Sequence, residues 1–164
     1  MHGVSRPLIF LDVDGVLIPF AARPVQPGSL VANRATGTGN PLLDRLDPQD
    51  GHRLSALGGD LVWATTWMAE ANETIAPRLG LPSLPVVEFP DADDPPPPGL
   101  HWKTEFLTRW ADGRAFIWLD DETTGADRRW VDTHHPGRAL VHRVDPVVGL
   151  TARDFALIRQ WLAE

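Results

Sequence analysis

The stretch LIFLDVDGVL, residues 8–17, places two carboxylates at the end of a strongly apolar run. An apolar run of this length that is bounded by glycine predicts a buried strand, and open α/β sheets bind their ligands at the carboxyl ends of strands. In an extended chain Asp12 and Asp14 share one face, where two like charges are costly unless a cation or a proton intervenes. Gly15 permits a turn directly after them. The stretch therefore predicts an acidic site, and the alternative is an ordinary acidic turn.

A second acidic segment follows another apolar run. Residues 115–122, AFIWLDDE, end in Asp120, Asp121 and Glu122. Three consecutive acids at a strand end repel one another unless a hard cation is present, and Mg²⁺ prefers oxygen ligands of this kind. The segment therefore predicts a cation site. Glu122 is expected to face away from it and to be solvated.

A third apolar run, LVWATT at residues 61–66, ends in Thr65 and Thr66. A threonine at a strand end can donate its O–H, and the neighbouring backbone N–H groups can also face an anion such as a phosphoryl group. The alternative is that both are ordinary strand residues, because threonine is common in strands.

Lys103 is the one lysine among the 15 Lys and Arg residues of the chain. It begins a segment in which Trp102, Phe106, Leu107 and Trp110 recur at helical spacing. A lysine in the first turn of a helix lies at the less favourable end of the helix dipole, so a nearby anion or carboxylate would explain its position. The alternative is a solvated surface lysine.

Taken in the order in which they occur along the chain, these four segments resemble the four motifs of the haloacid dehalogenase (HAD) superfamily. The closer resemblance is to the HAD domain of "Swiss Army Knife" RNA repair proteins, and it rests on residues 61–67, 102–104 and 118–122. It extends from about residue 8 to residue 161, although residues 21–48 match only loosely. The resemblance implies an α/β, three-layer Rossmann-like fold with a minimal cap or flap.

The resemblance also implies which residues carry out the reaction. HAD phosphatases use the first aspartate of the first motif as nucleophile and the second as general acid and base, which correspond here to Asp12 and Asp14. Thr65 is the implied phosphate-binding hydroxyl, with Thr66 as second choice. Lys103 is implied to stabilise the equatorial phosphoryl oxygens.

The implied cofactor is Mg²⁺. Its ligands would be Asp12, the backbone carbonyl of Asp14, and Asp121. Of the two adjacent acids in the fourth motif, Asp121 is the implied direct ligand and Asp120 its partner.

The implied activity is hydrolysis of phosphomonoesters through an aspartyl-phosphate, on a small phosphorylated substrate. An acid at Asp14 favours phosphoryl chemistry, because dehalogenases do not need one there. A net charge of −7 disfavours long nucleic acids, since binding to a phosphate backbone depends on clustered Lys and Arg. The alternatives are a 3′- or 5′-phosphatase that processes nucleic-acid ends, and a non-catalytic interaction module that uses the proline-rich loop.

Alternating strands and helices predict a five-stranded parallel sheet with helices on both faces. A single domain over residues 1–164 is expected, with a flap or cap over about 19–48 and a stiff proline-rich loop over about 90–100. Strands are expected at 7–13, 60–65, 84–88, 115–119 and 139–143. Helices are expected at 49–58, 68–79, 102–111, 124–131 and 151–163.

Two helix boundaries are indicated by residue type. Thr151 and Asp154 have the spacing of a capping box, with aspartate in place of the usual glutamate, and predict the start of the last helix. Pro77 is expected to end or kink the second predicted helix, because proline lacks the N–H that the helix needs.

Composition excludes several classes of protein. The chain has no cysteine, so disulfides, thiolate chemistry and zinc–cysteine sites are absent. No apolar run approaches the roughly 20 residues that cross a bilayer. The amino end leads directly into the first predicted strand, which leaves no room for a signal peptide. A cytoplasmic enzyme without a membrane partner is therefore expected.

Overall fold

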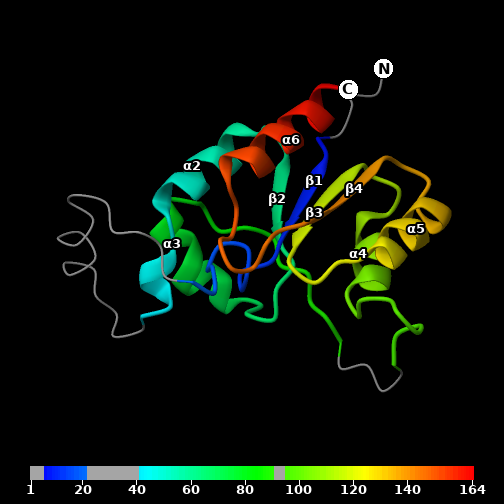
Figure 1. The fold of residues 1–164 in the computed structure, drawn as a ribbon, viewed down its shortest axis with the longest axis horizontal. Coiled ribbons are helices and arrows are strands. Elements are labelled where there is room, and N and C mark those ends of the chain that lie inside the picture. Colours follow the sequence, from blue (N-terminus) through cyan, green and yellow to red (C-terminus); the bar gives the residue numbers. More distant parts are fainter. Residues whose placement is uncertain (1–5, 22–40, 91–94) are drawn as a thin grey trace.

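Four parallel strands form the centre of the protein in the computed structural model, which describes residues 6–21, 41–90 and 95–164 (Figure 1). The fold is α/β, and the order of the strands is β2-β1-β3-β4. The strands are β1 (Leu8–Leu11), β2 (Asp60–Trp63), β3 (Phe116–Asp120) and β4 (Ala139–Arg143). The helices are the 3-10 helix η1 (Leu43–Arg45), α2 (Pro48–Ala56), the π-helix η2 (Ala71–Ile75), α3 (Ala76–Leu79), α4 (Thr104–Ala111), α5 (Gly125–His134) and α6 (Ala152–Ala163).

The register of the sheet brings the carboxyl ends of three strands together. Leu11, the last residue of β1, pairs with Trp63 of β2 and with Leu119 of β3. The residues that follow these positions, among them Asp12 and Asp120, therefore lie along one edge of the sheet.

Both faces of the sheet are covered, so the three-layer arrangement is as predicted. Ile9 and Leu11 pack with residues of α2, α3 and α6, whereas Leu8 and Phe10 pack with residues of α4 and α5. Figure 1 shows these two groups of helices on opposite sides of the strands. Burial on both faces explains why β1 is apolar throughout rather than alternating, and each such side chain contributes roughly 1.5–3 kcal/mol.

The predicted fifth strand at residues 84–88 is wrong for the described part of the chain. Only one isolated bridge forms there, between Trp63 and Val86. The backbone of Leu84 is bonded instead to the side chain of Asn72, which accepts from its N–H and donates to its carbonyl, both at 2.8 Å. Pro85 has no N–H to donate to a ladder. The segment therefore follows the edge of β2 without forming a strand.

The predicted start of the last helix is confirmed, whereas the helix that contains Pro77 does not end there but continues to Leu79. Thr151 and Asp154 form a capping box at the start of α6. Pro77 lies in the first turn of α3, where the π-helix η2 gives way to an α-helix. The predicted helix at 68–79 begins only at Ala71, because Met68 has a positive φ of 53° that a helix does not tolerate.

Two predicted segments fall partly outside the described ranges. Of the flap expected over 19–48, residues 22–40 lie outside them, and the rest includes η1 and the start of α2. Residues 91–94 of the proline-rich loop also lie outside them. The loop ends in a turn in which the Leu100 N–H donates to the Pro97 carbonyl at 3.0 Å, with Gly99 at a φ of 80°. No helix within the described ranges has the length and apolar character needed to span a membrane.

Candidate active site

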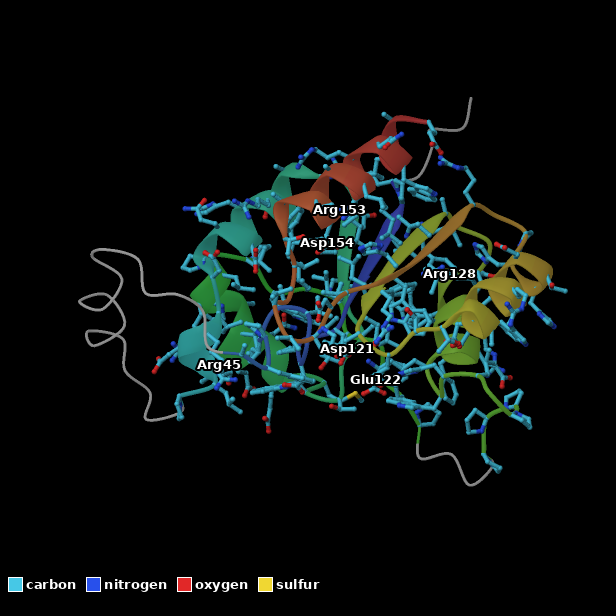
Figure 2. The ribbon with its side chains drawn as sticks, in the orientation of Figure 1. Arg45, Asp121, Glu122, Arg128, Arg153 and Asp154 are labelled. Carbon is cyan, nitrogen blue, oxygen red and sulfur yellow. The ribbon has the colours of Figure 1, made fainter. Side chains whose placement is uncertain are left out.

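A cavity of about 130 Å³ lies at the carboxyl edge of the sheet. It collects every side chain that the sequence predicted for the site except Thr65. Its lining residues are Asp12, Asp14, Phe20, Thr66, His101, Trp102, Lys103, Asp120, Asp121 and Glu122. Figure 2 shows Asp121 and Glu122 together beyond the end of β3.

Three aspartates from two strands meet in this cavity. Asp12 follows β1, Asp120 is the last residue of β3, and Asp121 follows it. One carboxylate oxygen from each lies within 4.8 Å of the others, and the residues are only 8%, 1% and 8% exposed. The two acidic segments, more than a hundred residues apart in sequence, therefore converge on one point as predicted.

Lys103 is buried between two of these aspartates. Its Nζ donates to Asp120 Oδ2 at 2.9 Å and to the Ala64 carbonyl at 3.0 Å, and it lies 3.4 Å from Asp12 Oδ1. Burial alone would lower its pKa, but the carboxylates of Asp12 and Asp120 raise that pKa above its usual value. The alternative of a solvated lysine is thereby wrong.

The cluster carries more negative charge than Lys103 can neutralise. Three carboxylates and one ammonium leave two negative charges in a largely buried volume. Burial, together with repulsion from Asp120, raises the pKa of Asp12 to about 7 against the attraction of Lys103. Burial and the same neighbour raise the pKa of Asp121 to about 6. Each shift means that burial and neighbouring negative charge outweigh the positive charge that stabilises the ionised form.

The donor set of this cluster fits a divalent cation. Carboxylate oxygens are the ligands that Mg²⁺ prefers, and octahedral Mg²⁺ needs ligand oxygens within about 4.2 Å of one another. One oxygen from each aspartate lies within 4.8 Å of the others, so small side-chain adjustments would bring them around one ion. A charge of +2 would balance the two uncompensated carboxylates, so the buried aspartates can hold a metal ion.

Gly15 allows the loop after β1 to pack against Asp121. The Val13 carbonyl accepts hydrogen bonds from Val16, Leu17 and Ile18, which closes a tight loop over residues 13–18. Gly15 has a φ of 78° in this loop, and a Cβ there would lie 2.6 Å from Asp121 Oδ2. Any larger residue would therefore strain the backbone and displace the Asp121 carboxylate.

We expect Gly15→Ala to lower any catalytic rate that this site supports by about 10²-fold, because a 1 Å misplacement in a site costs about that much. Gly58→Ala is the matched control, since Gly58 has a φ of 80° but no atom within 4 Å of the position that a Cβ would take. The control should lose stability without a comparable loss of activity. Equal activity of the two variants in steady-state assays would contradict a role for the Gly15–Asp121 contact.

The two threonines lie in different surroundings. Thr65 is buried, and its hydroxyl oxygen accepts from the Trp67 N–H at 3.2 Å. Thr66 is exposed and lines the cavity. Asp14 is also exposed there, and its Oδ2 accepts from the indole N–H of Trp67 at 3.2 Å. The second-choice threonine is thus the one that borders the cavity.

Sequence reasoning missed the part that four lining residues play. His101 could have been found, because a histidine two residues before a buried lysine can close a turn. Its Nδ1 accepts from the Lys103 N–H at 3.0 Å, and burial lowers its pKa below the usual value. Glu122 lines the cavity, so the prediction that it faces away is wrong, although it is exposed as expected. Phe20 and Trp102 are exposed aromatic residues at the cavity.

A parallel sheet of order 2-1-3-4, with acids after the two central strands and a buried lysine between them, defines the Rossmann-like core of HAD domains. A family model described as "HAD domain in Swiss Army Knife RNA repair proteins" matches residues 8–155, and the chain belongs to this family. Comparison with curated proteins and with solved structures gives no match.

Proposed function

We propose that this protein is a Mg²⁺-dependent phosphohydrolase that cleaves phosphomonoesters through an aspartyl-phosphate on Asp12. The observation that supports this function is the buried cluster of Asp12, Asp120 and Asp121 around Lys103 at the carboxyl edge of the sheet. Membership of a HAD family supports the same reaction class. A nucleophilic carboxylate and a site for a divalent cation are the two elements that this chemistry needs.

In the first step a carboxylate oxygen of Asp12 bonds to phosphorus, and the bond from phosphorus to the leaving oxygen breaks. Asp14 gives its proton to that oxygen as it leaves. In the second step water attacks phosphorus and gives a proton to Asp14, and the bond to Asp12 breaks to release inorganic phosphate. The exposure of Asp14 and its bond to the Trp67 indole support this role, because they leave one oxygen free to face solvent.

The metal would be held by Asp12, the Asp14 carbonyl and Asp121, and when bound it would neutralise charge on the phosphoryl oxygens. Asp120 is the weaker candidate for direct ligation, since Oδ2 accepts from Lys103 and Oδ1 accepts from the Glu122 N–H at 3.0 Å. Its bonds suit the partner role that the sequence suggested.

Two further residues of the cavity would bind the phosphoryl group. Lys103 brings a positive charge within reach of the nucleophile and of the equatorial oxygens, where charge is spread in the transition state. Thr66 borders the cavity and supplies a hydroxyl donor, while Thr65 shapes the turn through the Trp67 N–H.

A small phosphorylated substrate is favoured by the size of the cavity, about 130 Å³, and by the acidic balance of the chain. One observation favours a second candidate, a phosphatase of nucleic-acid ends. Phe20 and Trp102 offer exposed rings at the cavity, and nucleic-acid bases stack on such rings. The description of the family links it to RNA repair.

Turnover of a generic aryl phosphate, followed by a screen of phosphorylated metabolites and of 3′- and 5′-phosphate oligonucleotides, tests both candidates. Activity in Mg²⁺ buffer that EDTA abolishes and added Mg²⁺ restores is the expected result. Preference for oligonucleotides, lost steeply as salt rises, would promote the second candidate. No turnover of any ester, with no metal-dependent thermal shift, would favour a non-catalytic interaction module.

The pKa of Asp12 predicts how metal binding depends on pH. Folding raises this pKa from 3.8 to about 7, so between those values the folded state binds more protons than the unfolded state. The contribution of Asp12 to the stability of the metal-free protein therefore falls as pH rises from about 4 to about 7. Mg²⁺ binds the deprotonated carboxylates, so the rise in Tm on adding Mg²⁺ should be larger at pH 8 than at pH 5. Equal rises would contradict this linkage.

A further inference from the structure

His101 presents a fixed hydrogen-bond donor at the cavity. Its Nδ1 accepts from the Lys103 backbone N–H at 3.0 Å, so Nδ1 carries no proton and the ring proton is on Nε2. The side chain is only 6% exposed, which holds the ring in place. Among the described residues Nε2 has no hydrogen-bonded acceptor, since the nearest charged partner, Glu122 Oε2, is 3.7 Å away.

Glu122 places an acceptor beside that donor. Its backbone N–H is tied to Asp120 Oδ1, whereas its side chain is 71% exposed and can change rotamer. A donor N–H and a carboxylate therefore face each other across one side of the cavity. Both residues are held beside the aspartate cluster. His101 accepts from the Lys103 N–H, the Glu122 N–H donates to Asp120, and Lys103 and Asp120 form an ion pair.

A hydroxyl group is the ligand that satisfies both sides of this pair. Its oxygen accepts from Nε2–H while its O–H donates to the carboxylate. A carbonyl or phosphoryl oxygen would accept from His101 but would be repelled by Glu122, and an ammonium would donate to Glu122 but could not accept from His101. A hydroxyl oxygen about 2.8 Å from both His101 Nε2 and Glu122 Oε2 requires these two atoms to move slightly further apart than 3.7 Å. The exposed Glu122 side chain allows this movement.

We propose that His101 and Glu122 form a hydroxyl-binding subsite that selects phosphomonoesters with a free hydroxyl near the phosphate. The inference rests on the phosphohydrolase activity proposed above and names its substrate class. A polyol phosphate and a ribose phosphate both present this chemistry.

The test compares substrates that differ only in this hydroxyl. One pair is glycerol 2-phosphate and isopropyl phosphate, and the other is adenosine 3′-monophosphate and its 2′-deoxy analogue. A hydrogen bond to a charged group is worth about 1.5–3 kcal/mol, so the wild type should prefer the hydroxylated member by about 10- to 100-fold in kcat/KM. Preference in the first pair alone assigns polyol phosphates, and preference in the second alone assigns ribose phosphates.

Two variants remove the subsite without removing the nucleophile. His101→Asn keeps an acceptor for the Lys103 N–H but has no group in the position of Nε2, and Glu122→Ala removes an exposed carboxylate. Each should lower kcat/KM for the hydroxylated member more than for its partner and so bring the preference towards one. The double variant should lose no more of the preference than either single variant, because both side chains hold one hydroxyl. Glu73→Ala, an exposed glutamate on η2, is the control that should retain the preference.

The outcomes separate this inference from the proposed activity. Equal turnover within both pairs by the wild type would overturn the subsite and leave the hydrolase standing. Equal losses on both members in His101→Asn and Glu122→Ala would also overturn it, since that pattern belongs to a structural role. No turnover of any of the four esters or of an aryl phosphate would contradict the hydrolase itself, and the subsite with it.

Discussion

Asp12→Asn is expected to abolish turnover of an aryl phosphate, with a loss in kcat of at least about 10⁴-fold, because the amide cannot form the covalent bond to phosphorus. The variant keeps the size of the side chain and its place at the end of β1. Steady-state assays in Mg²⁺ buffer measure the loss. Retained activity would show that the nucleophile lies elsewhere.

Two controls separate this loss from a loss of fold. Asp132→Asn makes the same chemical change on the exposed surface of α5 and should leave the rate unchanged. Asp12→Asn itself should not lower Tm in the metal-free protein at pH 8. The change removes a buried negative charge that Asp120 and Asp121 repel. A large fall in Tm would mean that Asp12 is needed for folding, and the kinetic result would then say nothing about the nucleophile.

Lys103→Met should have the second largest effect, on stability and activity together. It leaves the buried carboxylates of Asp12 and Asp120 without their ammonium partner. Removing one member of a buried ion pair typically costs about 3–5 kcal/mol, and the loss of a charged transition-state contact costs about 10²–10³-fold in kcat. Urea unfolding in EDTA measures the first and steady-state kinetics the second.

Asp120, the ion-pair partner of Lys103, supplies a second test of this energy. Lys103→Met combined with Asp120→Asn should be less destabilised than the sum of the single variants, because the second change removes a charge that the first left unpaired. Arg109→Met, on the exposed surface of α4, should change stability by less than about 0.5 kcal/mol. If Lys103→Met were as stable as the wild type, the buried ion pair would not be an energetic feature of the fold.

The convergence of Asp12 and Asp120 could be predicted from sequence because it follows from a general rule. Parallel strands that run side by side end at one edge, and an apolar run that stops at an acid marks that edge. The register of β1 with β3 then places the two acids together. Lys103 was also within reach of prediction, since a lone lysine at a helix start needs a nearby negative charge.

What could not be predicted depends on contacts between residues that no local pattern connects. The strand expected at residues 84–88 fails because the amide of Asn72 takes both backbone groups of Leu84. The burial of Thr65 and the exposure of Thr66 depend on the turn after β2, in which Thr65 accepts from the Trp67 N–H and Met68 has a positive φ. These arrangements are set by tertiary structure rather than by propensity.

The burial of the single lysine has a practical consequence. Reagents that acylate primary amines would react slowly with the side chain of Lys103, because it is 3% exposed and lies beside two carboxylates. The rate of acylation at Lys103, measured by intact-mass spectrometry, would then report how often the cavity opens. Acylation of Lys103 therefore measures opening of the cavity without a spectroscopic label.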